Sequence, residues 1–397
     1  MLFFACFCTL LFCSAIKNTP FKNLGKRPCP IAFIITDVWS RCQAKSQIIL
    51  AANIINNNLQ ISERYVIIKQ TCSKQEIFMK HIFIHNPAAG KNSTAAIDAL
   101  KEKISAMAEP LDYEFYSTTE PGNATAYVRS RCQEEPNEQL RFYACGGDGT
   151  ANEVVHGLVG QANASMTIYP CGSGNDYVKY YGGAERFLDV EALIHATETP
   201  VDIMQIGDRY ALNVTHFGFD TAVARTMAKV RRKKIIGGRN AYTTGVIAAL
   251  LTAMKNDCTV WVDGEQLNNG KMLLCTVANG SHVGGAYRCA PHTVNDDGLL
   301  EVCLVHPISR FTFVKLISKY KEGSHLDDPR FRNLIAYRRG KSVRVSAPQG
   351  FAFSLDGELV EQNEFTIEVL PRAIRFAVPA EPAKTETTTP QKEFETV

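Results

Sequence analysis

The stretch RFYACGGDGT, residues 141–150, is a run of apolar and aromatic side chains that ends in a glycine turn. A short apolar run closed by glycine is typical of a buried strand, and residues 151–158 after it predict a helix. Glycine has no Cβ, so backbone N–H groups in such a turn can approach phosphate oxygens, and the following helix N-terminus favours an anion. Such turns are also common for purely structural reasons, so this stretch alone does not establish a nucleotide site.

The same alternation of strand, turn and helix extends to both sides of this stretch. We expect strands at residues 81–85, 113–116, 141–145 and 166–170, and helices at residues 93–107, 124–131 and 151–158. This alternation argues for a parallel sheet with helices on both faces. The sequence therefore predicts a Rossmann-like α/β domain over residues 80–205.

The pattern of apolar and polar residues changes after about residue 201, which predicts a second domain over residues 206–378. Alternating apolar and polar residues indicate strands at 210–214, 258–262, 272–277, 299–305, 342–345 and 365–370. One long helical stretch is expected at residues 223–255. We therefore expect a β-sandwich-type C-terminal domain, and a length of 397 residues agrees with two domains.

Both ends of the chain differ from this core. Residues 2–16 are apolar but short for a membrane span, and they lack the positive charges of a secretory signal. We expect residues 1–79 to be a non-core extension, with translation starting near Met79, where the first strong strand begins. Residues 379–397 are polar and rich in Pro and Thr, which predicts a disordered tail.

Composition excludes several classes of function. A net charge of +3 gives no global field for binding nucleic acid. The 13 cysteines form no CxxC pair and no Cys/His ligand spacing, so neither a zinc site nor a redox dithiol is indicated. We interpret them as buried free thiols of a protein in a reducing cytoplasm.

Three loops are expected to share one edge of the parallel sheet: residues 86–90, 146–150 and 172–176. The carboxyl ends of neighbouring parallel strands line one crevice. Small residues, amides and the carboxylates of Asp148 and Asp176 around one crevice suit a polyphosphate with its magnesium. The loop at Gly90 is not a Walker A motif, because it lacks the earlier glycine and Asn92 stands where Ser or Thr is required. The protein-kinase signatures are also missing.

In chain order, these motifs resemble those of the diacylglycerol kinase catalytic family, which includes sphingosine kinases and soluble bacterial lipid kinases. The resemblance covers most of residues 80–376 and rests on residues 86–90 (NPAAG), 146–154 (GGDGTANEV), 172–176 (GSGND), 217–220 (FGFD), 279–280 with 284–285, 291, 297–300 (DGLL) and 356–358 (DGE).

This resemblance implies a role for particular residues. Glu358 would be the proton acceptor, favoured over Asp148, and Asp297 would hold a structural Mg²⁺ with the backbone oxygens of Leu299 and Val294. Ser173 stands where relatives often have threonine, and it keeps the hydroxyl. The residues expected around ATP are Asn86, Pro87, Ala88, Ala89, Gly90, Thr119, Gly147, Asp148, Gly149, Thr150, Ala151, Asn152, Glu153, Ser173 and Asp176.

Without the resemblance, the segments at residues 296–298 and 356–358 are most simply β-turns. With it, the expected reaction is the transfer of phosphate from ATP to the hydroxyl of diacylglycerol, in a cytoplasmic protein peripherally associated with the membrane. The basic cluster Lys229, Arg231, Arg232, Lys233 and Lys234, followed by the apolar residues 242–254, is a candidate for docking on anionic lipid or simply a solvated helix end.

Alternatives are left open by the sequence. A kinase of a sphingoid base or of NAD would use the same ATP loops. A non-catalytic nucleotide-binding protein is disfavoured by the presence of Asp148, Asp176, Asp297 and Glu358. No transmembrane span is expected in the core, and the sequence does not decide whether the chain forms a homodimer.

Overall fold

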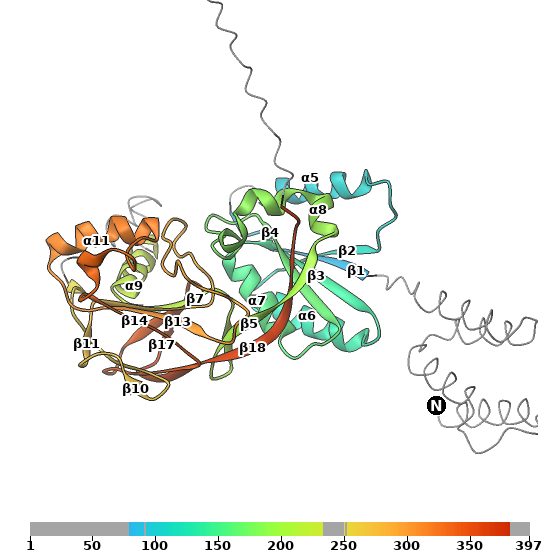
Figure 1. Cartoon of the computed structure of the whole chain (residues 1–397). Helices are drawn as coiled ribbons and strands as arrows, with labels where there is room; N and C mark the ends of the chain where they lie inside the picture. Colours follow the sequence, from blue (N-terminus) through green and yellow to red (C-terminus); the bar gives the residue numbers. More distant parts are fainter. Residues whose placement is uncertain (1–78, 91–92, 233–249, 251, 382–397) are drawn as a thin grey trace, which may run out of the picture. The chain divides into compact units, whose positions relative to one another are not determined.

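The computed structural model of the chain describes residues 79–90, 93–232, 250 and 252–381 (Figure 1). The expected N-terminal extension before Met79 and the expected tail from residue 382 onward lie outside the described residues. The same is true of Lys233 and Lys234 and of the side chains of Lys229, Arg231 and Arg232.

A parallel sheet with helices on both faces forms the first part of the described chain, as predicted. Strand β3 lies between β4 and β1, and β2 pairs with the other side of β1. Helices α5 and α8 cover one face of the sheet, and α6 and α7 cover the other (Figure 1). The elements are β1 (Met79–His85), α5 (Ser93–Ser105), β2 (Tyr113–Ser117), α6 (Asn123–Glu134), β3 (Gln139–Gly146), α7 (Asp148–Leu158), β4 (Ala164–Pro170), η1 (Tyr177–Tyr181), η2 (Ala184–Leu188) and α8 (Val190–Ile194).

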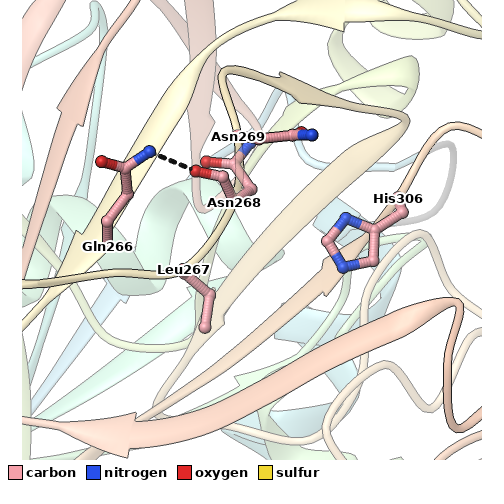
Figure 2. Close-up of a pocket in the computed structure, with 5 residues that line it drawn as sticks. All are labelled: Gln266, Leu267, Asn268, Asn269 and His306. Carbon is pink, nitrogen blue, oxygen red and sulfur yellow. Dashed lines mark hydrogen bonds between the residues drawn. The ribbon is translucent and has the colours of Figure 1, made fainter.

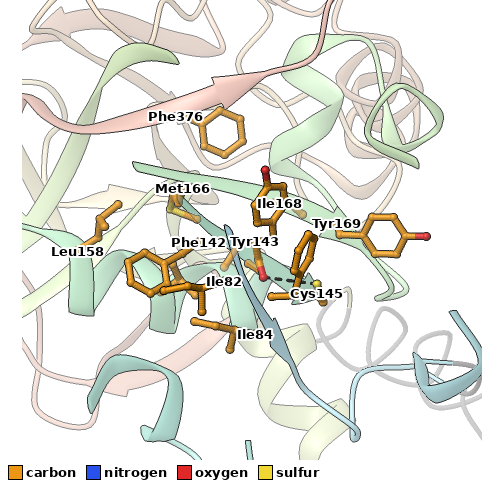
Figure 3. Packing of buried hydrophobic residues seen from close by; sticks show 14 of the residues in the cluster. Ile82, Ile84, Phe142, Tyr143, Cys145, Leu158, Met166, Ile168, Tyr169 and Phe376 are labelled. Carbon is orange, nitrogen blue, oxygen red and sulfur yellow. Dashed lines mark hydrogen bonds between the residues drawn. The ribbon is translucent and has the colours of Figure 1, made fainter. Parts of the chain in front are cut away.

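Burial on both faces explains why these strands are almost continuously apolar. All seven residues of β4 are buried, and in β1 and β3 only the first residues are not. Phe142, Met166 and Leu158 pack together in this core (Figure 3). Phe83 stacks on Tyr143 with ring centroids 4.2 Å apart. The core thus holds the carboxyl ends of β1, β3 and β4 in fixed register.

Two facing sheets form the second part, which confirms the predicted sandwich-type domain. One is antiparallel with the order β14-β13-β12-β7-β16-β17, and the other contains β10, β9, β15 and β18 with β5 and β6. Apolar residues from both sheets share one core, among them Val260, Val343, Phe217 and Val302. The strands are β5 (Thr197–Ile206), β6 (Arg209–Ala211), β7 (Val214–Gly218), β8 (Asn256–Asp257), β9 (Thr259–Val262), β10 (Glu265–Gln266), β11 (Lys271–Met272), β12 (Leu274–Ala278), β13 (Leu300–Val305), β14 (Ile335–Gly340), β15 (Ser342–Ser346), β16 (Ala352–Leu355), β17 (Glu358–Glu361) and β18 (Glu364–Val378).

Two helices cover the outer face of the six-stranded sheet: α9 (Phe219–Arg232) and α11 (Arg310–Glu322) (Figure 1). Phe219 and Phe313 bring the helices together, with ring centroids 4.7 Å apart. Both belong to a third apolar cluster that includes Leu274 and Cys303 of the sheet. No helix in the described ranges is long and apolar enough to cross a membrane.

Strand β18 joins the parallel strands of the first domain to one of the two facing sheets of the second, so that these strands form a single ten-stranded sheet. It pairs with β15 and β5 along most of its length, and near its end Phe376 lies opposite Met166 of β4 in parallel register. Phe376 is fully buried in the core of the first domain (Figure 3). A segment more than 200 residues away in sequence therefore completes the packing around β4.

Two expected elements differ in the structure. The strand expected at residues 210–214 is broken into β6 and β7, because the N–H groups of Leu212 and Asn213 donate to the carboxylate of Asp356 rather than to a neighbouring strand. The helix expected at residues 223–255 begins earlier, at Phe219, and residues 253–255 are not helical. The part of it at residues 233–249 and 251 lies outside the described residues.

Candidate active site

The structure brings the three predicted loops together at one edge of the parallel sheet. The amide Nδ2 of Asn86 donates to Oγ1 of Thr150 over 3.1 Å, joining the first loop to the second. Oδ1 of Asp148 accepts the backbone N–H of Asp176 over 2.7 Å, joining the second loop to the third. These contacts follow from the order β4-β3-β1, which places the three loops side by side.

Glycine allows these loops to touch through their backbones. A Cβ on Gly172 would clash with the Cα of Gly147. At Gly90, where φ is +75°, a Cβ would lie 2.6 Å from the carbonyl oxygen of Cys171. The glycines that the sequence singled out are therefore required by close backbone approach.

The N-terminus of α7 opens into this junction. Gly147 is the N-cap residue, and no side chain caps the first turn. The first N–H groups of a helix have no partner within the helix, so this end carries partial positive charge and can bind an anion. A Cβ on Gly149 would meet no atom within 4 Å, so the space beside this turn is open.

Two carboxylates lie at the junction. Burial and then the nearby charge of Asp176 raise the pKa of Asp148 to about 6. Asp176 itself is buried and held by Nζ of Lys179 at 2.6 Å and by the N–H of Gly285 at 3.0 Å. Lys179 was not among the expected site residues, although its position three residues after Asp176 is a usable signal.

Asn152 and Glu153 make contacts within the protein. Nδ2 of Asn152 donates to the carbonyl oxygen of Tyr210 and to Oδ2 of Asp356, over 2.9 and 3.1 Å. Oε2 of Glu153 accepts the N–H of Ala124 over 3.2 Å at the start of α6, where the N-cap residue is a glycine without a side chain. Both side chains are thus engaged within the protein, and their expected place around ATP stays a prediction.

Asp356, part of the DGE motif, has hydrogen-bond partners that could not be predicted from the sequence. Its carboxylate accepts N–H groups from Leu212, Asn213 and Val214 over 2.7, 3.1 and 2.8 Å, in addition to the amide of Asn152. The aspartate has a φ of 45° and the following glycine one of 95°, as in a two-residue hairpin between β16 and β17. The Asp-Gly pair was interpreted as a turn, but nothing local in the sequence indicates its partners.

Glu358, the expected proton acceptor, is the first residue of β17 and pairs with Leu355 across the hairpin. Its side chain is 66% exposed and forms an ion pair with Arg209 at 3.7 Å. The turn that carries this carboxylate is therefore fixed by Asp356, while the carboxylate itself remains accessible.

Thr119 and Ser173, both expected near ATP, are exposed. The hydroxyl and the N–H of Thr119 both donate to Oδ1 of Asn123, over 2.8 and 3.0 Å, at the start of α6. Because β2 is next to β1 in the parallel sheet, the turn after β2 lies on the same edge as the three loops.

The carboxylate of Asp297, expected to hold a magnesium ion, is engaged within the protein. Oδ1 of Asp297 accepts the N–H of Leu299 over 3.1 Å, and Oδ2 forms an ion pair with Arg339. Val294 has an exposed side chain. Within the described residues, no group of three or more His, Cys, Asp or Glu side chains is arranged to hold a metal ion. A guanidinium already neutralises the carboxylate, so we assign no metal chemistry to Asp297.

A hollow of about 390 Å³ lies elsewhere, at the β10–β11 connection. Figure 2 shows its lining, in which Nε2 of Gln266 donates to the carbonyl oxygen of Asn268 over 2.6 Å. His306 is the only titratable residue in the lining, and none of the expected site residues contributes. Without a carboxylate or a glycine turn, this hollow is not suited to phosphoryl transfer.

Comparisons with known families agree with this geometry. Residues 80–206 match the diacylglycerol kinase catalytic domain, and residues 213–378 match the YegS C-terminal NAD kinase beta sandwich-like domain. The two matches follow each other along the chain and together include the three loops, Asp356 and Glu358.

Curated relatives and solved structures extend the likeness over most of the described chain. The chain is 25% identical over 306 residues to a diacylglycerol kinase of Bacillus subtilis, which covers 76% of this chain and 97% of the relative. It is also 25% identical over 269 residues to a "Probable lipid kinase YegS-like" of Alcanivorax borkumensis, covering 66% of this chain and 85% of the relative. A crystal structure of a diacylglycerol kinase from Bacillus anthracis has the same fold, with a TM-score of 0.54 at 20% identity over 77% of this chain and 98% of that one.

Removing the carboxylate of Asp356 is expected to destabilise the protein strongly. In D356A, three backbone N–H groups and the amide of Asn152 would lose their acceptor, and the free energy of unfolding should fall by about 4 kcal/mol. Denaturant unfolding monitored by circular dichroism measures this change.

Asp263 offers a matched control. It also precedes a glycine in a two-residue turn with positive φ, and it accepts the N–H groups of Lys341 and Ser342 at an exposed edge. D263A should lower the free energy of unfolding by only about 1 kcal/mol. Equal losses in the two variants would contradict the special role of Asp356.

The raised pKa of Asp148 predicts a pH-dependent loss of stability. An aspartate in the unfolded chain titrates near pH 3.9. Between about pH 4 and pH 6, the unfolded chain therefore releases a proton that the folded protein keeps. The folded state loses stability as the pH rises through this window, and the loss is constant above it.

D148N removes this titration. The stability of the wild type relative to D148N should fall by about 2 kcal/mol between pH 4 and pH 6 and then stay constant to pH 8. Unfolding curves of both proteins at each pH give this difference. A difference that does not change with pH would show that the carboxyl group titrates normally in the folded protein.

Proposed function

The chain belongs to the lipid kinase family that carries a diacylglycerol kinase catalytic domain, and we propose that it transfers the γ-phosphate of ATP to the hydroxyl of 1,2-diacylglycerol, giving phosphatidate and ADP. The observation that carries the proposal is the junction of three glycine-containing loops at the uncapped N-terminus of α7. Phosphoryl transfer needs mainly a rigid cradle for the phosphates, neutralisation of charge and a base near the attacking hydroxyl.

The phosphates of ATP would lie against the turn of residues 147–150. The free N–H groups of the first turn of α7 would donate to phosphate oxygens, and the open space beside Gly149 admits them. The loop of residues 86–90 and Ser173 would close the cradle from either side. Asn152 and Glu153 would act indirectly, by holding α7 against the second domain and against α6.

Asp148 would hold a magnesium ion together with the phosphates, through the carboxylate oxygen that does not accept the N–H of Asp176. Mg²⁺ in phosphoryl-transfer sites keeps several waters and takes one or two carboxylates along with substrate oxygens. When bound, the ion neutralises charge on the transferred group. Asp176 is already engaged by Lys179 and Gly285, so its part is to fix the third loop and to raise the pKa of Asp148.

Glu358 is proposed as the base that takes the proton from the lipid hydroxyl. The oxygen of that hydroxyl would attack the γ-phosphorus as the bond to ADP breaks. Three features support Glu358: its exposed carboxylate, its place on a turn anchored by Asp356, and the tie from Asp356 to Asn152 of α7. With ATP as the phosphate donor, we place the reaction at the cytoplasmic surface of a membrane.

Radiolabelled ATP offered with diacylglycerol, sphingosine, a polyprenol and NAD tests the acceptor. We expect label in phosphatidate, at a rate that exceeds the other products by about 100-fold, and product chromatography identifies the acceptor. Label in phosphorylated sphingosine or in NADP, with none in phosphatidate, would refute the assignment of diacylglycerol.

The same assay tests the base. E358Q should lower kcat by about 100-fold or more, because loss of a general base typically has an effect of this size. E361Q is a matched control, since Glu361 is an exposed acid on the same strand that pairs with Arg225. Full turnover by E358Q would remove Glu358 from the mechanism and leave Asp148 as the candidate.

The backbone contact between the second and third loops can be tested by measuring the affinity of the protein for MgATP. In G172A, the added methyl group must push the third loop away from Gly147, so Kd for MgATP should rise about tenfold or more. G160A is the control: Gly160 follows the C-terminal end of α7, has a positive φ, and an added Cβ there would meet no atom within 4 Å. Backbone strain in G160A should therefore lower the stability of the protein, while its Kd for MgATP stays unchanged. Calorimetric titration gives both Kd values, and an unaltered Kd in G172A would contradict the proposed phosphate cradle.

A further inference from the structure

Helix α11 presents apolar side chains to solvent. Phe311 is 86% exposed and Val314 is 63% exposed, which makes them the two most exposed large hydrophobic residues in the described part of the chain. Three residues apart on a helix, they lie on the same face. Single exposed apolar residues are ordinary, whereas an adjacent pair exposed to this degree is a candidate contact surface.

The inner face of the same helix is fully engaged, so folding does not require the outer face. Phe313 and Leu316 are buried, and the hydroxyl of Tyr320 shares a hydrogen bond of 2.8 Å with Oγ1 of Thr276. Ser309 caps the N-terminus by accepting the N–H of Thr312 over 3.2 Å, and Gly323 ends the helix with a φ of 78°. Phe311 and Val314 thus stand on a rigid support.

Positive charge accompanies these apolar side chains. Lys315 and Lys321 are exposed, and α11 carries four basic residues against one acidic residue, Glu322, which pairs with Lys319. Arg310 at the start of the helix donates its Nε to the carbonyl oxygen of Leu250 over 2.7 Å. An apolar strip beside basic residues is the pattern of helices that lie in the surface of an anionic bilayer.

We propose that the outer face of α11 docks the protein on an anionic lipid bilayer. Phe311 and Val314 would enter the boundary between head groups and acyl chains, with Lys315 and Lys321 against lipid phosphates. The proposal rests on the proposed function, in which the acceptor is a lipid that resides in the membrane.

A short segment links the docking helix to the phosphate loops. At one end, the N–H of Arg288 donates to the carbonyl oxygen of Lys321 over 3.3 Å. At the other end, Gly285 donates its N–H to the carboxylate of Asp176 and accepts from Nζ of Lys179 over 2.8 Å. Residues 285–288 therefore connect the end of α11 with the third loop of the candidate active site.

Co-sedimentation with vesicles of equimolar phosphatidylglycerol and phosphatidylcholine, without nucleotide, tests the docking directly. F311A/V314A should weaken the partition coefficient by about tenfold through lost apolar contact. K315E/K321E should weaken it by about 25-fold or more and reduce its dependence on salt, because each near-surface lysine contributes about a factor of five.

Matched controls are available in the first domain and on the sheet edge. L188A/Y113A removes two apolar side chains that are also exposed, and K103E/K341E reverses two exposed charges outside α11. Both controls should bind vesicles like the wild type. Binding of the α11 variants equal to that of the wild type and the controls would overturn the proposal.

Activity separates the docking from the proposed function. On diacylglycerol in vesicles, the α11 variants should be slowed in proportion to their lost binding, whereas on a short-chain diacylglycerol dissolved as monomers they should match the wild type. If the wild type phosphorylates no diacylglycerol but its vesicle binding still depends on α11, the proposed function fails and the docking stands. Equal loss on the dissolved and the vesicle substrate would refute a docking role.

Discussion

The carboxylate of Asp356 satisfies three consecutive backbone N–H groups of the segment between β6 and β7 and the side-chain amide of Asn152. Asn152 belongs to the helix that begins at the candidate phosphate loop, and Asp356 begins the turn that presents Glu358. One carboxylate therefore sets the position of the proposed base relative to the proposed phosphate cradle. Hydrogen bonds to a charged acceptor are stronger and shorter than neutral ones, which suits a joint between two domains.

Much of the first domain was predictable because its signals are local. Each buried strand is a mostly apolar run, and a glycine or Asn-Pro lies at or just after its end, which marks the turn. The order of elements fixed a parallel sheet, and the rule that carboxyl ends share an edge predicted that Gly90, Gly147 and Gly172 would converge. These three glycines lie in loops that make backbone contact, as that rule requires.

The remaining features depend on partners far apart in sequence. Asn152 and Asp356 are separated by 204 residues, and no local sequence pattern indicates that their side chains form a hydrogen bond. Glu153 lies within a recognisable motif, yet its carboxylate caps a helix 29 residues earlier. The expected strand at residues 210–214 failed for the same reason, since its N–H groups bind a distant carboxylate. The outer face of α11 was missed because a single amphipathic helix in a β-rich region gives no hint of which side the sheet will cover.

Strand β18 has a consequence for the biogenesis of the protein. Phe376 fills the interior beside Met166, and the carbonyl oxygen of Ala377 accepts the hydroxyl of Thr167 over 2.8 Å. The ribosome makes these residues some 200 positions after β4, so the α/β layer emerges with an unfilled hydrophobic gap beside its edge strand. Unpaired strand edges of this kind are prone to aggregate. Final closure of this layer must therefore wait until residues 376–377 have been synthesised, and in that interval a nascent chain is open to chaperones.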